Sequence, residues 1–515
     1  MEKEFDLIVI GAGPGGYVAA VKAAKLGLKT AVLENREPGG TCLNRGCIPA
    51  KAMLHASGLL RKMQEAGRFG VFADNIRFDY GKILEYKEET SAQLRQGVAQ
   101  LLKANGAELL YGSGKILSKD TVEFTPVADK PASEAVGEGT RAAGGCANGS
   151  GAEAQAAGKC MADTGARVSP AGKPAAAPEL LHANHILIAT GSKPLRLPIP
   201  GIDLPGVVTS DGLFQLPKAP KSLLIIGGGV IGVEFATVFS ALGTKVTIVE
   251  ALPRILANLD KDFAQNLKMI LKKRGVEIIT GARVLSLQKK EAELVCTFLE
   301  KEEEKQIAAE CVLSAVGRVP ETEGLFGDGF ALDMNRGRIC VDGHFQTSVP
   351  DVYAIGDVTG GMQLAHAASA QGVFVAELLA GQKPGIRLDL VPSCVYTEPE
   401  IASIGVNEYD AKEQGLSVSV GKFLMGANGK SLISKEERGF VKVVADAETH
   451  RILGAQMMCA RATDMIGEFG TAIANRLTAE EMLLAMRAHP TYNEAVGEAL
   501  EELCGGSIHT VPRRK

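Results

Sequence analysis

Two stretches of the chain repeat one order of apolar and polar positions. In the first stretch, an apolar run at 5–10 leads into a glycine-rich turn at 11–16, and an apolar pattern of helical period follows at 17–26. A second apolar run at 30–33 then ends on Glu34. Short apolar runs bounded by turn residues are typical of buried strands, and the helical period indicates a helix. The pattern therefore predicts a strand, a tight turn, a helix and a second strand.

The second stretch follows the same order. An apolar run at 223–226 leads into a glycine-rich turn at 227–232, a helix that ends near Gly243, and a strand at 246–249 that ends on Glu250. The first glycine and the final acid are 23 residues apart in both copies, since 34 − 11 and 250 − 227 are equal. This order of elements is the fingerprint of dinucleotide-binding units. Two copies in phase make glycines that serve only tight turns a poor alternative.

Each position of the fingerprint has a physical role. The first glycine permits the tight turn, the second lets a pyrophosphate approach the backbone, and the third lets the helix pack closely on the strand. The helix N-terminus offers unpaired N–H groups to the phosphates, and the acid accepts hydrogen bonds from ribose hydroxyls. We therefore expect two bound dinucleotides, held by Gly11, Gly13, Gly16 and Glu34 in the first unit and by Gly227, Gly229, Gly232 and Glu250 in the second.

Glu250 bears on which nucleotide the second unit holds. A carboxylate at this position pairs with a ribose 2′-hydroxyl and repels a 2′-phosphate, which favours NAD. Arg254 follows four residues later and keeps NADP open as the alternative, because an arginine can hold a 2′-phosphate.

Length and composition narrow the class of protein. The 515 residues are too many for a single hydrophobic core, so about three or four domains are expected. A net charge of −4 argues against nucleic acid as a partner, and no apolar run is long enough for a membrane span. The first residues carry no signal-peptide or presequence pattern, which predicts a cytosolic protein. In such a reducing compartment, a close pair among the ten cysteines is more often catalytic or metal-binding than structural.

Cys42 and Cys47 form such a pair. Four residues separate them, about one helical turn plus a residue, so their Cα atoms can lie within disulfide range. Lys51 follows, and a thiolate near a lysine and a helix N-terminus has a lowered pKa and attacks disulfides readily. Two buried structural thiols, or half of a zinc site, are the alternatives. A zinc site needs two more ligands at metal spacing, and because we find no CxxC or HxxxH to supply them we expect no metal.

The redox segment also carries a family resemblance. GGTCLNRGCIPAK at 39–51, placed after the first glycine-rich turn, resembles the active-site segment of the class I pyridine nucleotide–disulfide oxidoreductases. This family includes dihydrolipoyl dehydrogenases, glutathione reductases and mercuric reductases. The resemblance covers nearly the whole chain, with Ala50 as one departure where Ser or Thr is commoner. The further segments that resemble the family's motifs are ATGS at 189–192, AVGRVP at 315–320, AIGD at 354–357, QLAH at 363–366, YTEPE at 396–400 and HPTYNE at 489–494.

The resemblance implies both a fold and cofactors. The implied fold is α/β, with two Rossmann-like dinucleotide-binding domains, for FAD and NAD, and an α+β C-terminal dimer-interface domain. The implied bounds are 1–192 for the FAD-binding domain, 193–318 for the NAD-binding domain, 319–391 for a central FAD-contacting segment and 392–515 for the interface domain. Beyond the two fingerprints, the positions that match the family's cofactor contacts are Gly40, Thr41, Lys51, Gly114, Thr190, Gly191, Ser192, Glu234, Val284, Gly317, Asp357, Gln363, Leu364, Ala365 and His366.

His489 and Glu494 stand near the C-terminus in an arrangement that suits proton transfer. Proline favours the first position of a helix, so we expect His489 to lie just before a helix that runs from Pro490 to about Leu503. Glu494 can then hold one ring nitrogen and raise the basicity of the other. A lone histidine is usually structural. The resemblance, however, implies that His489 serves Cys42 of a second subunit, and hence that the protein is a homodimer.

Residues 126–178 depart from the family's pattern, which joins the flanking strands by a much shorter connection. We expect those strands at Lys115–Phe124 and His185–Ala189. Residues 126–178 contain no Leu, Ile or aromatic residue, so little apolar surface is present to offset the entropy of ordering. We interpret them as a flexible surface insertion rather than a small ordered domain, with Cys146 and Cys160 as incidental thiols. Its removal should leave FAD content and turnover intact.

The C-terminus bears on the substrate dithiol. Cys504 stands alone, whereas mercuric reductases end in vicinal cysteines and long thioredoxin reductases in a second redox pair. The arginine-bearing segment of the NADP-dependent glutathione reductases is absent at Glu250. The basic tail that starts at Ser507-Ile-His509 resembles the ending of dihydrolipoyl dehydrogenases. This resemblance implies that the protein uses NAD⁺ to oxidise dihydrolipoamide on a lipoyl-bearing protein of a 2-oxo acid dehydrogenase or glycine cleavage complex. The alternatives are another disulfide reductase of the family, or a flavoprotein component without catalysis.

Overall fold

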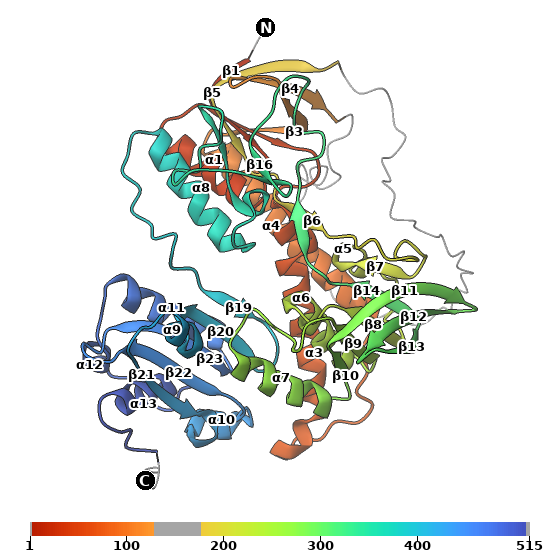
Figure 1. Ribbon diagram of the computed structural model, residues 1–515, viewed down its shortest axis with the longest axis vertical. Helices are drawn as coiled ribbons and strands as arrows, with labels where there is room; N and C mark the ends of the chain where they lie inside the picture. Colours follow the sequence, from red (N-terminus) through yellow and green to blue (C-terminus); the bar gives the residue numbers. More distant parts are fainter. Residues whose placement is uncertain (1–2, 128–176, 511–515) are drawn as a thin grey trace, which may run out of the picture.

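Three β-sheets form the centres of three packed regions in the computed structural model, which describes residues 3–127 and 177–510 (Figure 1). The mixed α/β class that the sequence predicts is confirmed. Within the described residues, no helix combines the length and the apolar character that crossing a membrane requires.

The first region is built on a six-stranded sheet of order β1-β2-β3-β4-β5-β18, in which β1 also pairs with β5. Strands β2, β1, β5 and β18 run parallel, and β3 pairs parallel with β2 but antiparallel with β4. Figure 1 shows α1 and α8 packed side by side against this sheet. The strands are β1 Lys3–Ile10, β2 Thr30–Glu34, β3 Glu108–Ile116, β4 Thr121–Pro126, β5 Glu179–Ile188 and β18 Val352–Ala354. The helices of this region are α1 Pro14–Lys25, α2 Gly40–Arg45, α3 Cys47–Gln64, η1 Ala66–Phe69, α4 Tyr80–Ala104, η3 Gly356–Thr359 and α8 Ala365–Leu379.

Alternation along β1 divides the core of this region into two layers. Leu7 and Val9 pack with α1, whereas Ile8 and Ile10 pack on the other face with β4 and β5. Because successive side chains of a strand point to opposite faces, a strand buried on both sides reads as one continuous apolar run. The predicted strand at 5–10 is therefore confirmed as a central, doubly covered strand.

The second region repeats this architecture on a parallel sheet of order β10-β9-β8-β14-β7. A three-stranded antiparallel sheet, β11-β12-β13, lies beside it. Its helices are α5 Ser210–Leu213, α6 Val230–Ala241 and α7 Lys261–Lys273. Its strands are β7 Val207–Thr209, β8 Ser222–Ile226, β9 Lys245–Glu250, β10 Glu277–Thr280, β11 Ala282–Lys290, β12 Glu293–Glu300, β13 Glu303–Ala309 and β14 Cys311–Ser314.

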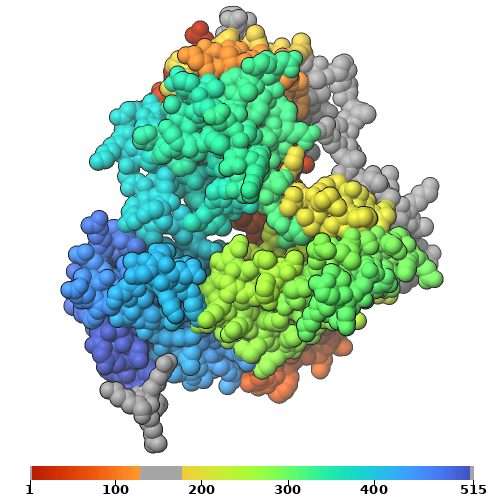
Figure 2. Space-filling model, viewed as in Figure 1, coloured from red at the N-terminus to blue at the C-terminus, as the bar shows by residue number. Residues whose placement is uncertain are grey.

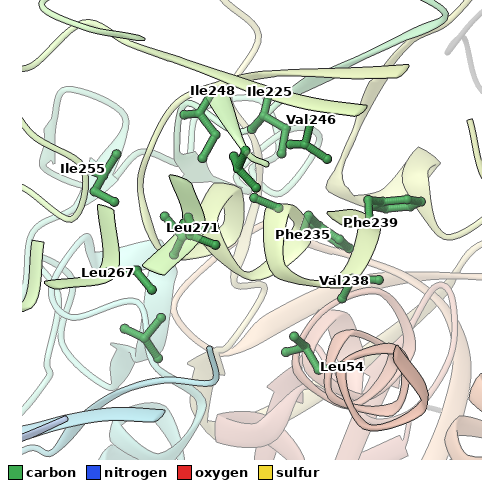
Figure 3. Packing of buried hydrophobic residues seen from close by; sticks show 14 of the residues in the cluster. Leu54, Ile225, Phe235, Val238, Phe239, Val246, Ile248, Ile255, Leu267 and Leu271 are labelled. Carbon is green, nitrogen blue, oxygen red and sulfur yellow. The ribbon is translucent and has the colours of Figure 1, made fainter. Parts of the chain in front are cut away.

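The core of the second region extends into α3. Figure 3 shows Leu54 of α3 beside Phe235 and Val238 of α6, below the sheet residues Ile225 and Ile248. All five side chains are buried in one cluster. Apolar packing therefore holds α3, the helix that begins with Cys47, against the second nucleotide-binding unit.

The third region is a five-stranded antiparallel sheet of order β19-β20-β23-β22-β21 covered by helices. Its strands are β19 Ser393–Val395, β20 Glu400–Gly405, β21 Val418–Leu424, β22 Phe440–Asp446 and β23 Ile452–Cys459. Its helices are α9 Glu408–Glu413, η4 Met425–Ala427, α10 Gly429–Ser434, α11 Ala462–Ala474, α12 Ala479–Leu483 and α13 Glu494–Leu503. Two short pairs complete the fold, β6 Ser192–Pro194 with β15 Arg318–Pro320 and β16 Met334–Asn335 with β17 Arg338–Ile339.

The strands predicted on either side of the insertion were wrong in their bounds. Residues 115–124 form a hairpin, because β3 ends at Ile116 and β4 begins at Thr121. The Ser118 hydroxyl donates to Asp120 at 2.6 Å, and such short polar side chains favour a turn over a continuous strand. β5 begins at Glu179 rather than His185, because its first half pairs with both β4 and β1.

The predicted insertion at 126–178 lies almost wholly outside the described residues, and Cys146 and Cys160 lie outside them too. Its two flanks are described, and they meet. Phe124 pairs directly with Glu179 across the antiparallel strands β4 and β5. The chain therefore leaves the sheet and returns to it at one hairpin.

Deleting residues 128–176 should leave the FAD content per chain unchanged and raise the free energy of unfolding by no more than about 2 kcal/mol, since each halving of a loop lowers its closure cost by only about 0.6 kcal/mol. The deletion leaves Thr125, Pro126, Val127, Ala177 and Pro178 between the paired Phe124 and Glu179, which is a common hairpin-loop length. Flavin absorbance and thermal unfolding measure the outcome. As a control, a longer deletion of 121–183 removes β4 and should lose flavin. A 128–176 deletion that expresses well without FAD would contradict the prediction.

Candidate active site

The two cysteines of the redox segment lie at the junction of two helices. Cys42 is in α2, and Cys47 is the first residue of α3. Both are half-buried free thiols, which is the reduced state of the predicted pair. Gly46 separates the helices, and a Cβ at this position would lie 2.9 Å from Thr41 O. A larger residue would therefore push the two helices apart.

The two thiols share one proton unevenly. A hydrogen bond between them lowers the pKa of Cys47 and raises that of Cys42. Burial opposes ionisation of Cys47, but Lys51 adds to the lowering, and the pKa of Cys47 reaches about 7. The position at the N-terminus of α3 favours the same charge. In the reduced state the thiolate therefore lies on Cys47, while Cys42 keeps its proton.

Lys51 belongs to a polar cluster around the buried Glu234 that joins the three regions. Its Nζ lies 3.0 and 2.9 Å from the two carboxylate oxygens of Glu234, which is buried in α6. The backbone N–H of Tyr396 donates to the same carboxylate at 3.0 Å, and Lys51 Nζ lies 4.4 Å from the centre of the Tyr396 ring. We call these three residues the Lys51–Glu234–Tyr396 cluster. Lys51 and Glu234 were predicted as site residues, but the contribution of Tyr396 was missed.

The redox segment also packs directly on the first glycine-rich turn. Gly39 N donates to Ala12 O at 2.8 Å. Gly40 has a φ of +58° and approaches Gly13 so closely that a Cβ on Gly40 would lie 2.7 Å from Gly13 Cα. The sulfur pair and the predicted phosphate site therefore form one continuous surface, with Thr41 of α2 next to the reacting sulfurs.

The two acids of the fingerprints are held in the same way. Glu34 accepts hydrogen bonds from Ala12 N and Arg36 N, both at 2.8 Å. Glu250 accepts from Gly228 N at 2.6 Å and from Leu252 N at 2.7 Å. Burial raises the pKa of Glu34, against the opposing effect of its two backbone hydrogen bonds. The two glycine-rich units, which the sequence predicts to be alike from their spacing, therefore also share the hydrogen bonds of their final acids.

The glycines of both turns leave room for a dinucleotide. Gly11 and Gly227 have φ of +103° and +107°, and a Cβ on either would lie 2.5 Å from a carbonyl oxygen, of Ala189 or Ala315. Gly16 and Gly232 let the helix pack on the carbonyl of the first glycine of each turn. The N-caps, Gly13 and Gly229, contribute no side-chain hydrogen bond to α1 and α6. Backbone N–H groups at both helix N-termini are thus left for phosphate oxygens, which fits the two expected cofactors.

The predicted contacts at 190–192 and at Asp357 meet in a polar cluster. The Ser192 hydroxyl donates to Asp357 Oδ2 at 2.5 Å and accepts from Arg318 Nε at 2.8 Å. The Thr190 hydroxyl donates to Glu321 O at 2.6 Å, and Gly191 has a φ of +73°. Asp357 lies in η3.

The remaining predicted cofactor residues differ in their surroundings. Gln363 and Leu364 precede α8, and Ala365 and His366 begin it, with no side-chain cap on the helix. The His366 ring contacts Pro392 O at 2.8 Å. Gly114 packs against Leu33. Val284 lies at a β-bulge of β11 beside an apolar cluster. Gly317 has a φ of +118°, and its carbonyl accepts a hydrogen bond from Leu195 N.

His489 and Glu494 are paired as predicted. His489 Nδ1 lies 2.7 Å from Glu494 Oε1, and Thr491 N donates to Glu494 Oε2 at 2.8 Å. Burial opposes ionisation of Glu494, but these two hydrogen bonds lower its pKa overall. The carboxylate therefore holds Nδ1–H and leaves Nε2 as the accepting nitrogen. The imidazole is 77% exposed on the third region.

The helix predicted to start at Pro490 was wrong in its start. A cis bond joins His489 to Pro490, and α13 begins only at Glu494. Residues 489–493 instead form a turn, because Glu494 accepts from Thr491 N and the Thr491 hydroxyl donates to Ala488 O at 2.8 Å. The predicted end near Leu503 is confirmed.

Arg254 was the reason for keeping NADP as an alternative cofactor, but its guanidinium forms hydrogen bonds within its own loop. Its Nη2 donates to Ala257 O at 2.8 Å and to Leu259 O at 3.3 Å. The guanidinium thus stabilises its own loop rather than reaching past Glu250 toward a 2′-phosphate. This geometry favours NAD.

Replacing Glu250 with glutamine should lower selectivity for NAD over NADP by about tenfold or more, because a charged hydrogen bond contributes about 1.5–3 kcal/mol. The change removes the negative charge that attracts the 2′-hydroxyl and repels a 2′-phosphate. The ratio of kcat/KM for the two nucleotides is the measurement. Glu34→Gln is a matched control at the equivalent position of the first unit and should leave this ratio unchanged. A Glu250→Gln ratio equal to that of the unmodified chain would contradict the prediction.

Comparisons with known proteins agree with this geometry. A family model described as pyridine nucleotide-disulphide oxidoreductase matches residues 5–372, and a model of that family's dimerisation domain matches residues 391–500. Dihydrolipoyl dehydrogenase from Bacillus subtilis is 37% identical over 99% of this chain and 100% of its own length. The protein of the same name from Halobacterium salinarum is 36% identical, over 99% of this chain and 98% of its own length.

Solved structures show the same architecture. The HOCl-induced flavoprotein disulfide reductase RclA from Escherichia coli has a TM-score of 0.78 and 27% identity, over 97% of this chain and 99% of its own. LpdA from Mycobacterium tuberculosis has a TM-score of 0.81 over 97% of this chain and 99% of its own, at 24% identity, and is similar in fold.

Proposed function

Because this chain belongs to the pyridine nucleotide-disulphide oxidoreductase family, we propose that it is a dihydrolipoyl dehydrogenase that oxidises protein-bound dihydrolipoamide to lipoamide with NAD⁺. Full-length relatives that carry this name support the proposal. The observation that carries it is the Cys42–Cys47 dithiol at the junction of α2 and α3, set between two dinucleotide cradles.

FAD and NAD are the cofactors of this family, and we assign FAD to the first unit and NAD to the second. The FAD contacts would come from Gly11, Gly13, Gly16, Glu34, Gly40, Thr41, Lys51, Gly114, residues 190–192, Asp357 and residues 363–366. The NAD contacts would come from Gly227, Gly229, Gly232, Glu234, Glu250, Val284 and Gly317. Bound FAD would supply the path by which an electron pair passes from the dithiol to NAD⁺.

The proposed domains are 1–192, 193–318, 319–391 and 392–515. The β6–β15 pair supports the two boundaries around the second domain, since Ser192 lies opposite Pro320 and Arg318 opposite Pro194. The chain would thus enter and leave the NAD-binding domain through adjacent strands. We call 392–515 the interface domain from here on.

The proposed reaction begins with proton transfer. His489 Nε2 accepts the proton of one substrate thiol, and the resulting thiolate attacks Cys42 of the oxidised pair. The Cys42–Cys47 bond breaks, a mixed disulfide forms, and Cys47 leaves as a thiolate. A thiol whose thiolate is stabilised leaves more readily, so the nearby Lys51 assists this step. The second substrate thiol then attacks the substrate sulfur of the mixed disulfide and breaks its bond to Cys42. Cys42 leaves and takes up a proton, lipoamide is released, and two electrons remain on the cysteine pair.

We propose that the active unit is a homodimer in which His489 serves Cys42 of the partner chain. The match to a dimerisation domain at 391–500 supports association, and the exposed imidazole on this domain supports a role toward another chain. The lipoyl-bearing partner would belong to a 2-oxo acid dehydrogenase or glycine cleavage complex. A reducing compartment such as the cytoplasm suits the free thiols of the described residues.

A matrix of substrates tests this function. Dihydrolipoamide, oxidised glutathione and mercuric ion are each assayed with the NAD and NADP couples. Dihydrolipoamide with NAD⁺ should have the highest kcat/KM, by about 10²-fold or more over the others, since a site that loses a substrate's specific contacts discriminates strongly. Faster glutathione reduction with NADPH would assign another reductase activity. An FAD-loaded protein without turnover on any dithiol would instead indicate a non-catalytic component.

A further inference from the structure

Three metal-ligating side chains converge on the interface domain, away from the redox segment. His450, Glu480 and Cys504 each present one donor atom, and the three atoms lie within 4.8 Å of one another. His450 Nδ1 is 2.5 Å from Glu480 Oε1, and Cys504 Sγ is 3.4 Å from the same oxygen. In the part of the chain that the structure describes, this is the only group of three such residues that meets so closely. No step of the proposed reaction uses it.

Each of the three residues stands on a fixed piece of backbone. His450 lies in the β22–β23 turn with a φ of +54°, and its carbonyl accepts from Ala479 N at 2.9 Å. Glu480 is in the first turn of α12, whose N-terminus is closed by a capping box. Cys504 is the C-cap of α13 and donates from its N–H to Glu501 O at 3.0 Å. Three separate elements therefore hold the backbone of the three ligands in place before any ion binds, which reduces the cost of binding.

We propose that His450, Glu480 and Cys504 form a binding site for a zinc-class divalent cation, with water as a fourth ligand. Imidazole, carboxylate and thiolate are all zinc ligands, and three of them with an open position is a common zinc arrangement. Magnesium and calcium prefer sites made of oxygen alone, so the donor set selects against them.

The observed distances need little change to accept the ion. Bonds of about 2.0–2.3 Å in a tetrahedron separate the ligand atoms by about 3.3–3.6 Å. The Cys504–Glu480 separation of 3.4 Å already matches. The His450–Glu480 hydrogen bond at 2.5 Å has to open, and the Glu480 side chain is half-exposed and free to turn.

The charges of the ligands also suit a cation. Glu480 supplies a carboxylate, and Cys504 a sulfur that binds metals as a thiolate. A bound cation would take the place of the thiol proton and relieve the contact between sulfur and carboxylate.

The site would fasten the two helices that flank the acid–base histidine. Glu480 lies in α12 and Cys504 ends α13, and the loop that carries His489 connects these helices. An ion bound by Glu480 of α12, Cys504 of α13 and His450 of the β22–β23 turn would link the two helices to each other and to the sheet. The expected consequence is a more stable α13, observed as a rise in the thermal midpoint with zinc concentration.

The test uses oxidised holoenzyme, in which a closed Cys42–Cys47 disulfide leaves no active-site thiol for zinc. Equilibrium dialysis with Zn²⁺ should give one ion per chain, and the thermal midpoint should rise with it. Co²⁺ should produce tetrahedral d–d bands at wavelengths beyond the flavin absorption. Cys504→Ser and His450→Asn should each weaken Zn²⁺ binding at least tenfold and abolish the thermal shift. Asparagine tolerates the left-handed backbone at position 450, so this variant keeps the turn.

Cys340→Ser is the matched control, because Cys340 is another exposed free thiol of the chain and takes no part in the cluster. Its Zn²⁺ affinity should equal that of the unmodified enzyme. Binding that is equally strong in Cys504→Ser and His450→Asn would overturn the proposal, as would the absence of any thermal shift with Zn²⁺ in the unmodified enzyme. These readouts are independent of dihydrolipoamide turnover.

Discussion

Replacing Cys47 with serine should reduce oxidation of dihydrolipoamide by about 10⁴-fold or more, the scale of loss when a residue of the reacting pair is removed. Serine cannot form a disulfide with Cys42, so the enzyme loses its electron acceptor for the substrate. It also removes the thiol whose pKa is held near 7 and which would leave as a thiolate. The measurement is kcat with dihydrolipoamide and NAD⁺, together with flavin absorbance per chain.

Flavin content should remain at one FAD per chain in this variant, because the oxygen of serine occupies less space than sulfur and the first glycine-rich turn is untouched. Cys311→Ser is a useful control for a buried thiol outside the site, and it should keep its turnover if it folds. Unchanged turnover in Cys47→Ser would refute the disulfide mechanism. Loss of flavin together with activity would show that Cys47 is needed for the fold of the site rather than for the reaction.

Replacing His489 with glutamine should slow the dithiol half of the reaction by about 10²–10⁴-fold, the usual contribution of a general base. Glutamine keeps a polar side chain near Glu494 but offers no nitrogen that accepts a proton at neutral pH. NADH oxidation with an artificial electron acceptor bypasses the dithiol and should change little. The two rates are measured on the same preparation, and equal losses in both would argue against His489 as the base.

A mixed dimer separates a role within one chain from a role toward the partner. If His489 serves Cys42 of the other chain, a dimer of one Cys47→Ser chain and one His489→Gln chain contains one intact site. Co-expression of differently tagged chains should then restore activity in the purified heterodimer. If His489 acts on its own chain, both sites remain defective and no activity returns.

Features that depend on local spacing were predicted correctly from the sequence. The distances between Gly11 and Glu34 and between Gly227 and Glu250 describe short segments whose backbone geometry is decided by neighbouring residues. The pairing of His489 with Glu494 is local in the same sense and is confirmed. The helix start was wrong because the preference of proline for a first helical position yields here to a turn.

Contacts between distant residues were outside the reach of pattern analysis. Lys51 and Glu234 are 183 positions apart, and Glu234 and Tyr396 are 162 apart. Hydrophobic period and residue spacing describe one element at a time, so they do not say which side chains of different elements meet. The group of His450, Glu480 and Cys504 was missed for the same reason. The ligand spacing that reveals many zinc sites is absent, because three elements supply one ligand each.

The Lys51–Glu234–Tyr396 cluster has a consequence for how the chain is completed during synthesis. Lys51 and Glu234 leave the ribosome well before Tyr396, so the buried carboxylate first meets its cation while its backbone donor is still missing. Domains generally fold in order of synthesis, and a buried charge with incomplete partners is costly. In the nascent protein, the two nucleotide-binding units should therefore be less stably packed against each other until the interface domain has been synthesised and has packed on them. A chain that stops short of position 396 should then be a substrate for proteases and chaperones rather than a stable flavoprotein.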